Sequence, residues 1–160
     1  MDSILSRASE TDVPKDSAVH KLMPDTSYED CFYCQADNRD FKSVDIVKLF
    51  FNSVPGWFST LMQLREKVAG FIGLKTASLT EEQFKAQLDA YTGKKEDKLA
   101  LFNTWYCDTN EIVFGEIDRH LDFCFSMKTV PEHSGTGIYL STTVRYNNWM
   151  GPVYFFPVKI

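Results

Sequence analysis

The sequence feature that most constrains the fold is a two-residue alternation of side chains that runs from residue 119 to residue 146 with one break. One face carries Leu121, Phe123, Phe125, Met127, Ile138, Leu140, Thr142 and Val144. Because successive side chains of a strand point to opposite faces, we expect two long neighbouring strands, 119–128 and 137–146, with a turn region at 131–137. Antiparallel strands of this kind have one buried and one largely solvent-exposed face, which here carries His120, Asp122, Cys124, Ser126 and Lys128.

The residues before this pair predict a strand and three helices. A strand is expected at 28–35, a polar turn at 37–40, and a helix from Ser43, as N-cap, to Asn52. Apolar residues at alternating steps of four and three, beginning at Trp57, predict a long helix over 55–72. Thr80 and Gln83 have the spacing of a capping box, which starts a short helix that Gly93 ends.

After the helices the period becomes that of strands again. Strands are expected at 99–106 and 111–117, joined by a hairpin turn at 108–110. The order of strand, helices and then four meandering strands is typical of an α+β fold, with the meander curved around the long helix. Residues 25–160 suffice for one domain, and residues 1–24, which lack periodicity, predict an extended N-terminal arm that contacts the body through Ile4, Leu5 and Val19.

Charge and composition exclude several function classes. The formal net charge is -5 and no dense basic run occurs, so the sequence does not favour nucleic-acid binding. No segment has the length of a signal peptide's apolar region or of a membrane span. We therefore expect a cytoplasmic protein with no membrane span, whose four cysteines are reduced.

Three strings carry a family resemblance: VPGWFSTLMQLREKVAGFIGLKT (54–76), EIDRHLDFCFSM (116–127) and VRYNNWMGPVYFF (144–156). In this order they resemble the bacterial family of domain of unknown function 2867, over about residues 22–160. That family is similar to the START and birch-pollen-allergen (SRPBCC) superfamily, whose helix-grip fold is a curved antiparallel sheet wrapped around a long helix with two shorter helices.

The resemblance implies an apolar cavity between sheet and helices. Relatives in the wider superfamily bind lipids, sterols or polyketides, a minority are cyclases or hydrolases, and similar domains occur fused to short-chain NAD-binding reductases. This chain has no glycine-rich dinucleotide fingerprint, and we expect no cofactor. The resemblance also implies a longer C-terminal helix than this sequence carries. Two explanations remain: the sequence is shortened, or the groove that this helix would cover is more open.

The residues most suggestive of catalysis are Asp118, Arg119, His120 and Asp122. A histidine between two carboxylates can serve as a general base held in one tautomer. Alternation places His120 and Asp122 on the polar face, opposite the expected cavity, so a turn with an ion pair explains the cluster equally well.

Cys31 and Cys34 have CxxC spacing, but both fall within the predicted strand. The odd offset points their sulfurs to opposite faces, and neither a second ligand pair nor a helix N-terminus accompanies them. We therefore expect no metal site.

The predicted ligand-binding wall combines the long helix with the apolar faces of the strands. Its residues are Trp57, Leu61, Leu64, Trp105, Phe114, Leu121, Phe123, Phe125, Leu140 and Thr142. Thr142, Tyr139 or Arg119 would orient a bound molecule. The resemblance includes an asparagine of the pair Asn147-Asn148 at the junction with the last helix and implies a capping role for it.

Three functions follow as hypotheses. The first is binding of a small apolar or amphipathic ligand. The second is a cyclase-like or hydrolase-like activity that uses His120 with Asp118 or Asp122. The third is an accessory module that forms a homodimer or docks onto a reductase partner; its contact residues would be Trp149, Met150, Tyr154 and Phe155.

Overall fold

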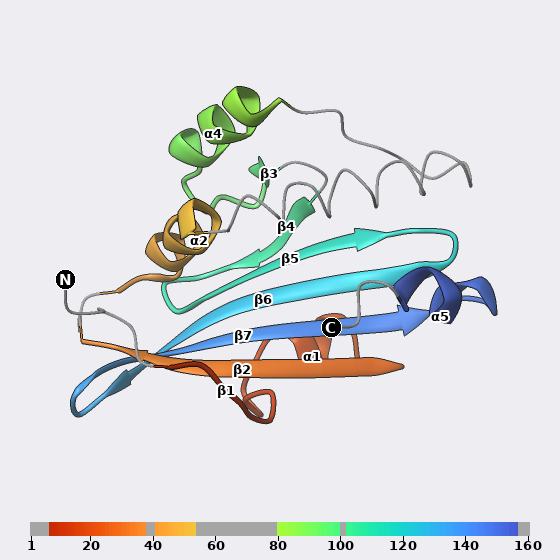
Figure 1. The fold of residues 1–160 in the computed structure, drawn as a ribbon, viewed down its shortest axis with the longest axis horizontal. Coiled ribbons are helices and arrows are strands. Elements are labelled where there is room, and N and C mark those ends of the chain that lie inside the picture. Colours follow the sequence, from red (N-terminus) through yellow and green to blue (C-terminus); the bar gives the residue numbers. More distant parts are fainter. Residues whose placement is uncertain (1–6, 38–40, 54–79, 100–101, 157–160) are drawn as a thin grey trace.

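The dominant element of the protein is a seven-stranded antiparallel sheet, seen in a computed structural model that describes residues 7–37, 41–53, 80–99 and 102–156 (Figure 1). The strands are β1 (Ser9–Glu10), β2 (Tyr28–Ala36), β3 (Lys98–Leu99), β4 (Phe102–Cys107), β5 (Glu111–Ile117), β6 (Leu121–Glu132) and β7 (Gly135–Tyr146). Their order is β1-β2-β7-β6-β5-β4-β3, so the first long strand pairs with the last. The predicted long helix at 55–72 and residues Ile4 and Leu5 lie outside the described residues.

Four helices are described: α1 (Val19–Leu22), α2 (Ser43–Ser53), α4 (Glu81–Ala90) and α5 (Met150–Phe155). Helix α4 begins with the predicted capping box, in which Thr80 accepts from the Gln83 backbone and the Gln83 side chain accepts from Thr80. Ser43 is the first residue of α2 rather than its cap, and its hydroxyl donates to the backbone oxygen of Asp108 at 2.6 Å. The α+β class is confirmed.

The hairpin of β6 and β7 is longer than predicted. Each strand has 12 residues, and only His133 and Ser134 separate them, so the turn lies within the predicted region 131–137 but is shorter than that region. Pairing with β2 keeps the start of β7 extended, since Ala36 lies opposite Thr136. A Cβ on Gly135 would lie 2.0 Å from the backbone oxygen of Ala36, so only glycine fits this approach. Tertiary pairing here overrides local turn preference.

The shorter hairpin between β4 and β5 has the predicted turn. Asp108 Oδ1 accepts hydrogen bonds from the backbone nitrogens of Asn110 and Glu111, both at 2.7 Å. A carboxylate that binds the following backbone amides stabilises a tight turn.

Helices α2 and α4 lie on one side of the sheet, which we call the inner face (Figure 1). The main core fills the space between them, with Val47, Leu99, Ile112, Phe114 and Met127 at most 1% exposed. Helix α2 packs against β5 and β6, and α4 against α2 and β3. This core positions the strands whose inner-face side chains form the candidate site.

The N-terminal segment covers part of the outer face of the sheet. Residues Val13, Val19 and Met23 pack against Cys31, Val113 and Cys124 of the strands. The prediction of a largely solvent-exposed face is therefore wrong for β6, where Asp122, Ser126 and Lys128 are at most 7% exposed. The predicted contact through Val19 is confirmed, but the arm also adds strand β1 and helix α1.

Candidate ligand-binding site

The strand register aligns four inner-face side chains in one row across the sheet. Asp30 lies opposite Thr142, Thr142 opposite Phe125, and Phe125 opposite Phe114. Residues directly opposite one another in an antiparallel ladder project from the same face. The predicted residues Phe114, Phe125 and Thr142 are thus brought together, and Asp30 joins them.

Neighbouring rows extend this wall. Phe32, Leu140 and Met127 form one row, and Val144 and Phe123 belong to the other. Most of these side chains are apolar, and they alternate with the residues that the N-terminal segment covers. The inner face is therefore an apolar wall with one carboxylate in its middle row.

The wall is covered unevenly. At its β5 side Phe114 is 1% exposed, because Phe51 of α2 and Tyr91 at the end of α4 pack against it with ring centroids 6.5 and 5.7 Å away. At its β2 side Phe32 is 41% exposed. Leu140 and Thr142 are half-buried between these extremes. The β2–β7 part of the inner face therefore presents apolar surface that another molecule can contact.

Asp30 is the polar group in this part of the wall. Its Oδ2 accepts a hydrogen bond from the Tyr28 hydroxyl at 2.8 Å, whereas its Oδ1 is buried and has no hydrogen-bond partner in the described structure. An acceptor buried without a partner costs about 1–3 kcal/mol, and more when it is charged. Burial, with the Asp30 carboxylate adding to it, raises the pKa of Tyr28 to about 12, so Tyr28 remains a donor.

Sequence reasoning missed Asp30, although the signal was present. In YEDCFYCQA the two-residue period places Asp30 on the same face as Tyr28, Phe32 and Cys34. An acid among apolar inner-face positions is unusual, because a carboxylate is rarely buried without a partner.

Helix α5 closes one end of the inner face. Phe155 is 5% exposed and packs between the rings of Tyr28 and Tyr146, with centroid distances of 5.0 and 6.2 Å. Trp149 stands at the N-cap position of α5, and the side chain before it makes the bond to the helix, since Asn148 Oδ1 accepts from the Met150 backbone at 3.0 Å. Trp149 is 80% exposed and does not pack against the sheet.

The other predicted wall residues divide into three groups. Trp57, Leu61 and Leu64 lie outside the described residues. Leu121 lies on the inner face under α5, beside Val144 and Phe155. Trp105 packs in the outer cluster, with its ring over Gly115, and this corrects its predicted place in the wall.

The cause of this correction is a register shift between Thr104 and Tyr106. Such an irregularity turns a side chain to the other face, and a regular alternation misassigns it. Tyr139, a predicted orienting residue, also lies in the outer cluster, whereas Thr142 is on the inner face.

The cluster around His120 forms the connection between β5, β6 and α5. His120 is 8% exposed, and its Nδ1 lies 3.0 Å from Nδ2 of Asn148. Asp122 binds Arg145 at 2.5 Å and Asn147 at 2.8 Å. The backbone oxygens of Asp118 and Arg119 accept from Asn147 and Asn148. The structure thus brings these residues to the asparagines that end β7, and general-base catalysis by His120 stays a prediction.

The four cysteines are free and lie on both faces of the sheet. Cys31 belongs to the outer cluster and Cys34 packs against the inner core, as the CxxC offset predicted. Burial raises the pKa of the Cys124 thiol to about 12. In the described part of the chain, no group of three or more His, Cys, Asp or Glu side chains is placed to hold a metal ion.

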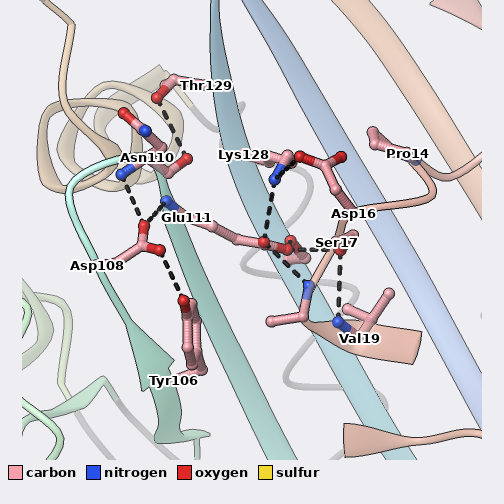
Figure 2. Close-up of polar contacts among 12 residues, drawn as sticks. Pro14, Asp16, Ser17, Val19, Tyr106, Asp108, Asn110, Glu111, Lys128 and Thr129 are labelled. Atoms are coloured by element: carbon pink, nitrogen blue, oxygen red, sulfur yellow. Dashed lines mark hydrogen bonds and ion pairs between the residues drawn. The ribbon is translucent and has the colours of Figure 1, made fainter. Parts of the chain in front are cut away.

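A second polar cluster, centred on Glu111, is buried on the outer face (Figure 2). The Glu111 carboxylate accepts from the Ser17 and Ser126 hydroxyls at 2.5 and 2.7 Å and from the Ala18 backbone at 3.0 Å. Lys128 lies 3.4 Å from Glu111 and 3.1 Å from Asp16. Each carboxylate oxygen of Glu111 has partners, so this cluster attaches the N-terminal segment to the sheet.

These elements define an α+β domain in which an antiparallel sheet has helices on its inner face and the N-terminal segment on its outer face. The family model described as "Protein of unknown function (DUF2867)" matches residues 22–160, and the chain belongs to this family. Searches among curated proteins and among solved structures found no match. No helix in the described ranges is long and apolar enough to cross a membrane.

Proposed function

We propose that the protein binds a small amphipathic molecule against the inner face of its sheet, in a helix-grip arrangement. The observation that carries this proposal is the uneven cover of the inner wall. Apolar side chains are half-buried or exposed along β2 and β7, next to a carboxylate with a free acceptor oxygen. An antiparallel sheet with helices on one face is compatible with the helix-grip fold and supports the proposal.

Apolar contact would supply most of the affinity. Phe32 is 41% exposed. This corresponds to about 80 Å² of a side chain that can bury about 200 Å². Covering that area with a ligand contributes about 2 kcal/mol, or about thirtyfold in affinity, before the cost of ordering the ligand.

The test is binding of N-phenyl-1-naphthylamine, an uncharged probe whose fluorescence rises in apolar surroundings. We expect saturable binding to the wild-type protein and binding about three- to thirtyfold weaker for Phe32→Ser. The matched control is Ile117→Ser, because Ile117 is 70% exposed but lies opposite Asp122, away from the inner face. Native mass spectrometry of freshly purified protein would reveal a retained ligand as an added mass.

Two results would contradict the proposal. The first is an absence of saturable probe binding by the folded wild-type protein. The second is equal weakening by Phe32→Ser and Ile117→Ser, which would place the probe on general surface rather than on the inner face.

A further inference from the structure

The charges that face inward in the described strands are all negative. Asp30 and Glu116 occupy inner-face positions, since Glu116 lies opposite Phe123, and Glu10 of β1 lies opposite Phe32. Among the strand residues described, no lysine or arginine occupies an inner-face position. The charges of these strands therefore disfavour an anionic head group and favour a cationic one.

Asp30 is the only one of these carboxylates with a buried acceptor that lacks a partner within the described residues. Its Oδ2 is already bound by the Tyr28 hydroxyl, so this hydrogen bond fixes the carboxylate and leaves Oδ1 for another donor. Thr142 lies directly opposite Asp30. On its other side the half-buried Phe125 lies opposite Thr142, and the half-buried Phe123 projects from the same face of β6. An ionised acceptor beside apolar surface suits a ligand with a donor at one end and an apolar body.

We infer that Asp30 selects amphipathic ligands whose head group is a protonated amine that donates a hydrogen bond to Oδ1. The inference rests on the proposed function, because it names the head group of the ligand that the inner face binds. The hydrogen bond would be charge-assisted on both sides, which is the stronger class of hydrogen bond.

The experiment compares ligands of one chain length against the wild-type protein. Dodecylamine, dodecanol, dodecanoate and dodecyltrimethylammonium each compete with bound N-phenyl-1-naphthylamine, below their micelle concentrations. We expect dodecylamine to bind about tenfold or more tighter than dodecanoate, and tighter than dodecanol. The trimethylammonium compound has the charge without an N–H donor, so it is expected to bind more weakly than the amine.

Asp30→Asn tests the assigned residue. The substitution preserves size and is expected to weaken dodecylamine binding about tenfold while leaving dodecanol within about threefold. The control is Glu29→Gln, which removes the same charge from the adjacent position of β2. Glu29 is exposed and points to the outer face, opposite Thr143, so this variant is expected to bind like the wild type.

The outcomes separate the inference from the proposed function. If the four compounds displace the probe equally, or if dodecanoate binds best, the inner face binds amphiphiles but the inference is wrong. The inference is also wrong if Asp30→Asn and Glu29→Gln change the amine affinity equally. If the probe does not bind at all, the proposed function fails and the inference fails with it. The comparison of the four ligands needs only the wild-type protein, so it tests the preference for an amine head group even if Asp30→Asn does not fold.

Discussion

Replacing Glu111 with glutamine tests whether the outer-face cluster holds the N-terminal segment on the sheet. Glu111 is 2% exposed and is the shared partner of Ser17 and Ala18 from the segment and of Ser126 and Lys128 from the sheet. The substitution retains the shape of the side chain and removes its charge. A glutamine amide can still bond to the two hydroxyls, because serine hydroxyls both donate and accept.

The interaction that the glutamine amide cannot replace is the ion pair of Glu111 with Lys128, so the Lys128 ammonium loses a buried partner. The Lys128 side chain is 9% exposed, and its remaining partner would be Asp16, whose side chain is 79% exposed. Removing one partner of a buried ion pair costs about 3–5 kcal/mol. The remaining contact with Asp16 reduces that cost, so we expect Glu111→Gln to lower the free energy of unfolding by about 2–4 kcal/mol.

Urea denaturation monitored by circular dichroism measures this loss, and Glu29→Gln provides the control. Because Glu29 is exposed on the same face, its variant is expected to stay within about 0.5 kcal/mol of the wild type. Adding Lys128→Met to Glu111→Gln removes the unpaired ammonium and is expected to recover more than about 1 kcal/mol. Limited trypsin digestion gives an independent readout, since release of the segment would speed cleavage after the exposed residues Lys15 and Lys21. A loss below about 0.5 kcal/mol for Glu111→Gln would refute the reasoning.

Two further predictions concern α5 and pH. Phe155→Ala is expected to lower the free energy of unfolding, measured by urea denaturation, by about 3 kcal/mol, because Phe155 is 5% exposed between two tyrosine rings. Trp149→Ala is the control and is expected to lower it by less than about 0.5 kcal/mol, because Trp149 is 80% exposed. Equal losses would contradict the packing of α5. The hydrogen bond from Lys128 lowers the pKa of Asp16 below its ordinary 3.8, so the stability that this pair provides is present above that value and is lost as pH falls below it. Burial disfavours the charged form of Lys128, but the carboxylates of Asp16 and Glu111 outweigh this effect and raise the pKa of Lys128 above 10.5. The stability that the charged Lys128 contributes is therefore complete below pH 10.5 and is lost as pH rises through the raised pKa. Asp16→Asn should flatten the acid side of a plot of urea midpoint against pH, and an unchanged acid side would contradict the assignment.

The strands could be predicted from the sequence where a long alternation of apolar and polar side chains is compatible with only one assignment of residues to the two faces of the sheet. Residues 111–117 are a strand with the predicted bounds, β7 contains the predicted segment 137–146, and β6 contains the predicted segment 119–128 except for its first two residues. The turn of Asp108 and the capping box of Thr80 were also predictable, because each depends on side chains within a few residues of the backbone they bind.

What the sequence did not reveal depends on contacts between distant residues. The pairing of β2 with β7 joins residues a hundred or more positions apart, and it extends β7 into the expected turn region. The covering of the outer face depends on a segment without periodicity, whose few contacts, such as Val19 with the strands, are spread over irregular backbone. The place of Trp105 depends on a single register shift, which no alternation pattern contains.

The carboxylates buried on the two faces of the sheet differ in how fully they are hydrogen-bonded, and this difference is relevant to the role of Asp30. On the outer face the carboxylates of Glu111 and Asp122 are each bound by several donors. Within the described residues, two buried side-chain atoms lack a partner: Thr143 Oγ1 on the outer face and Oδ1 of Asp30 on the inner face. A threonine in a central strand is explained by the packing of its branched side chain, and its neutral hydroxyl costs less without a partner than a charged group does. A carboxylate is not explained in that way, because an apolar residue would pack there at lower cost. The position of Asp30 in a mostly apolar wall, beside the 41% exposed Phe32 on the same strand, therefore argues for a partner that comes from outside the chain.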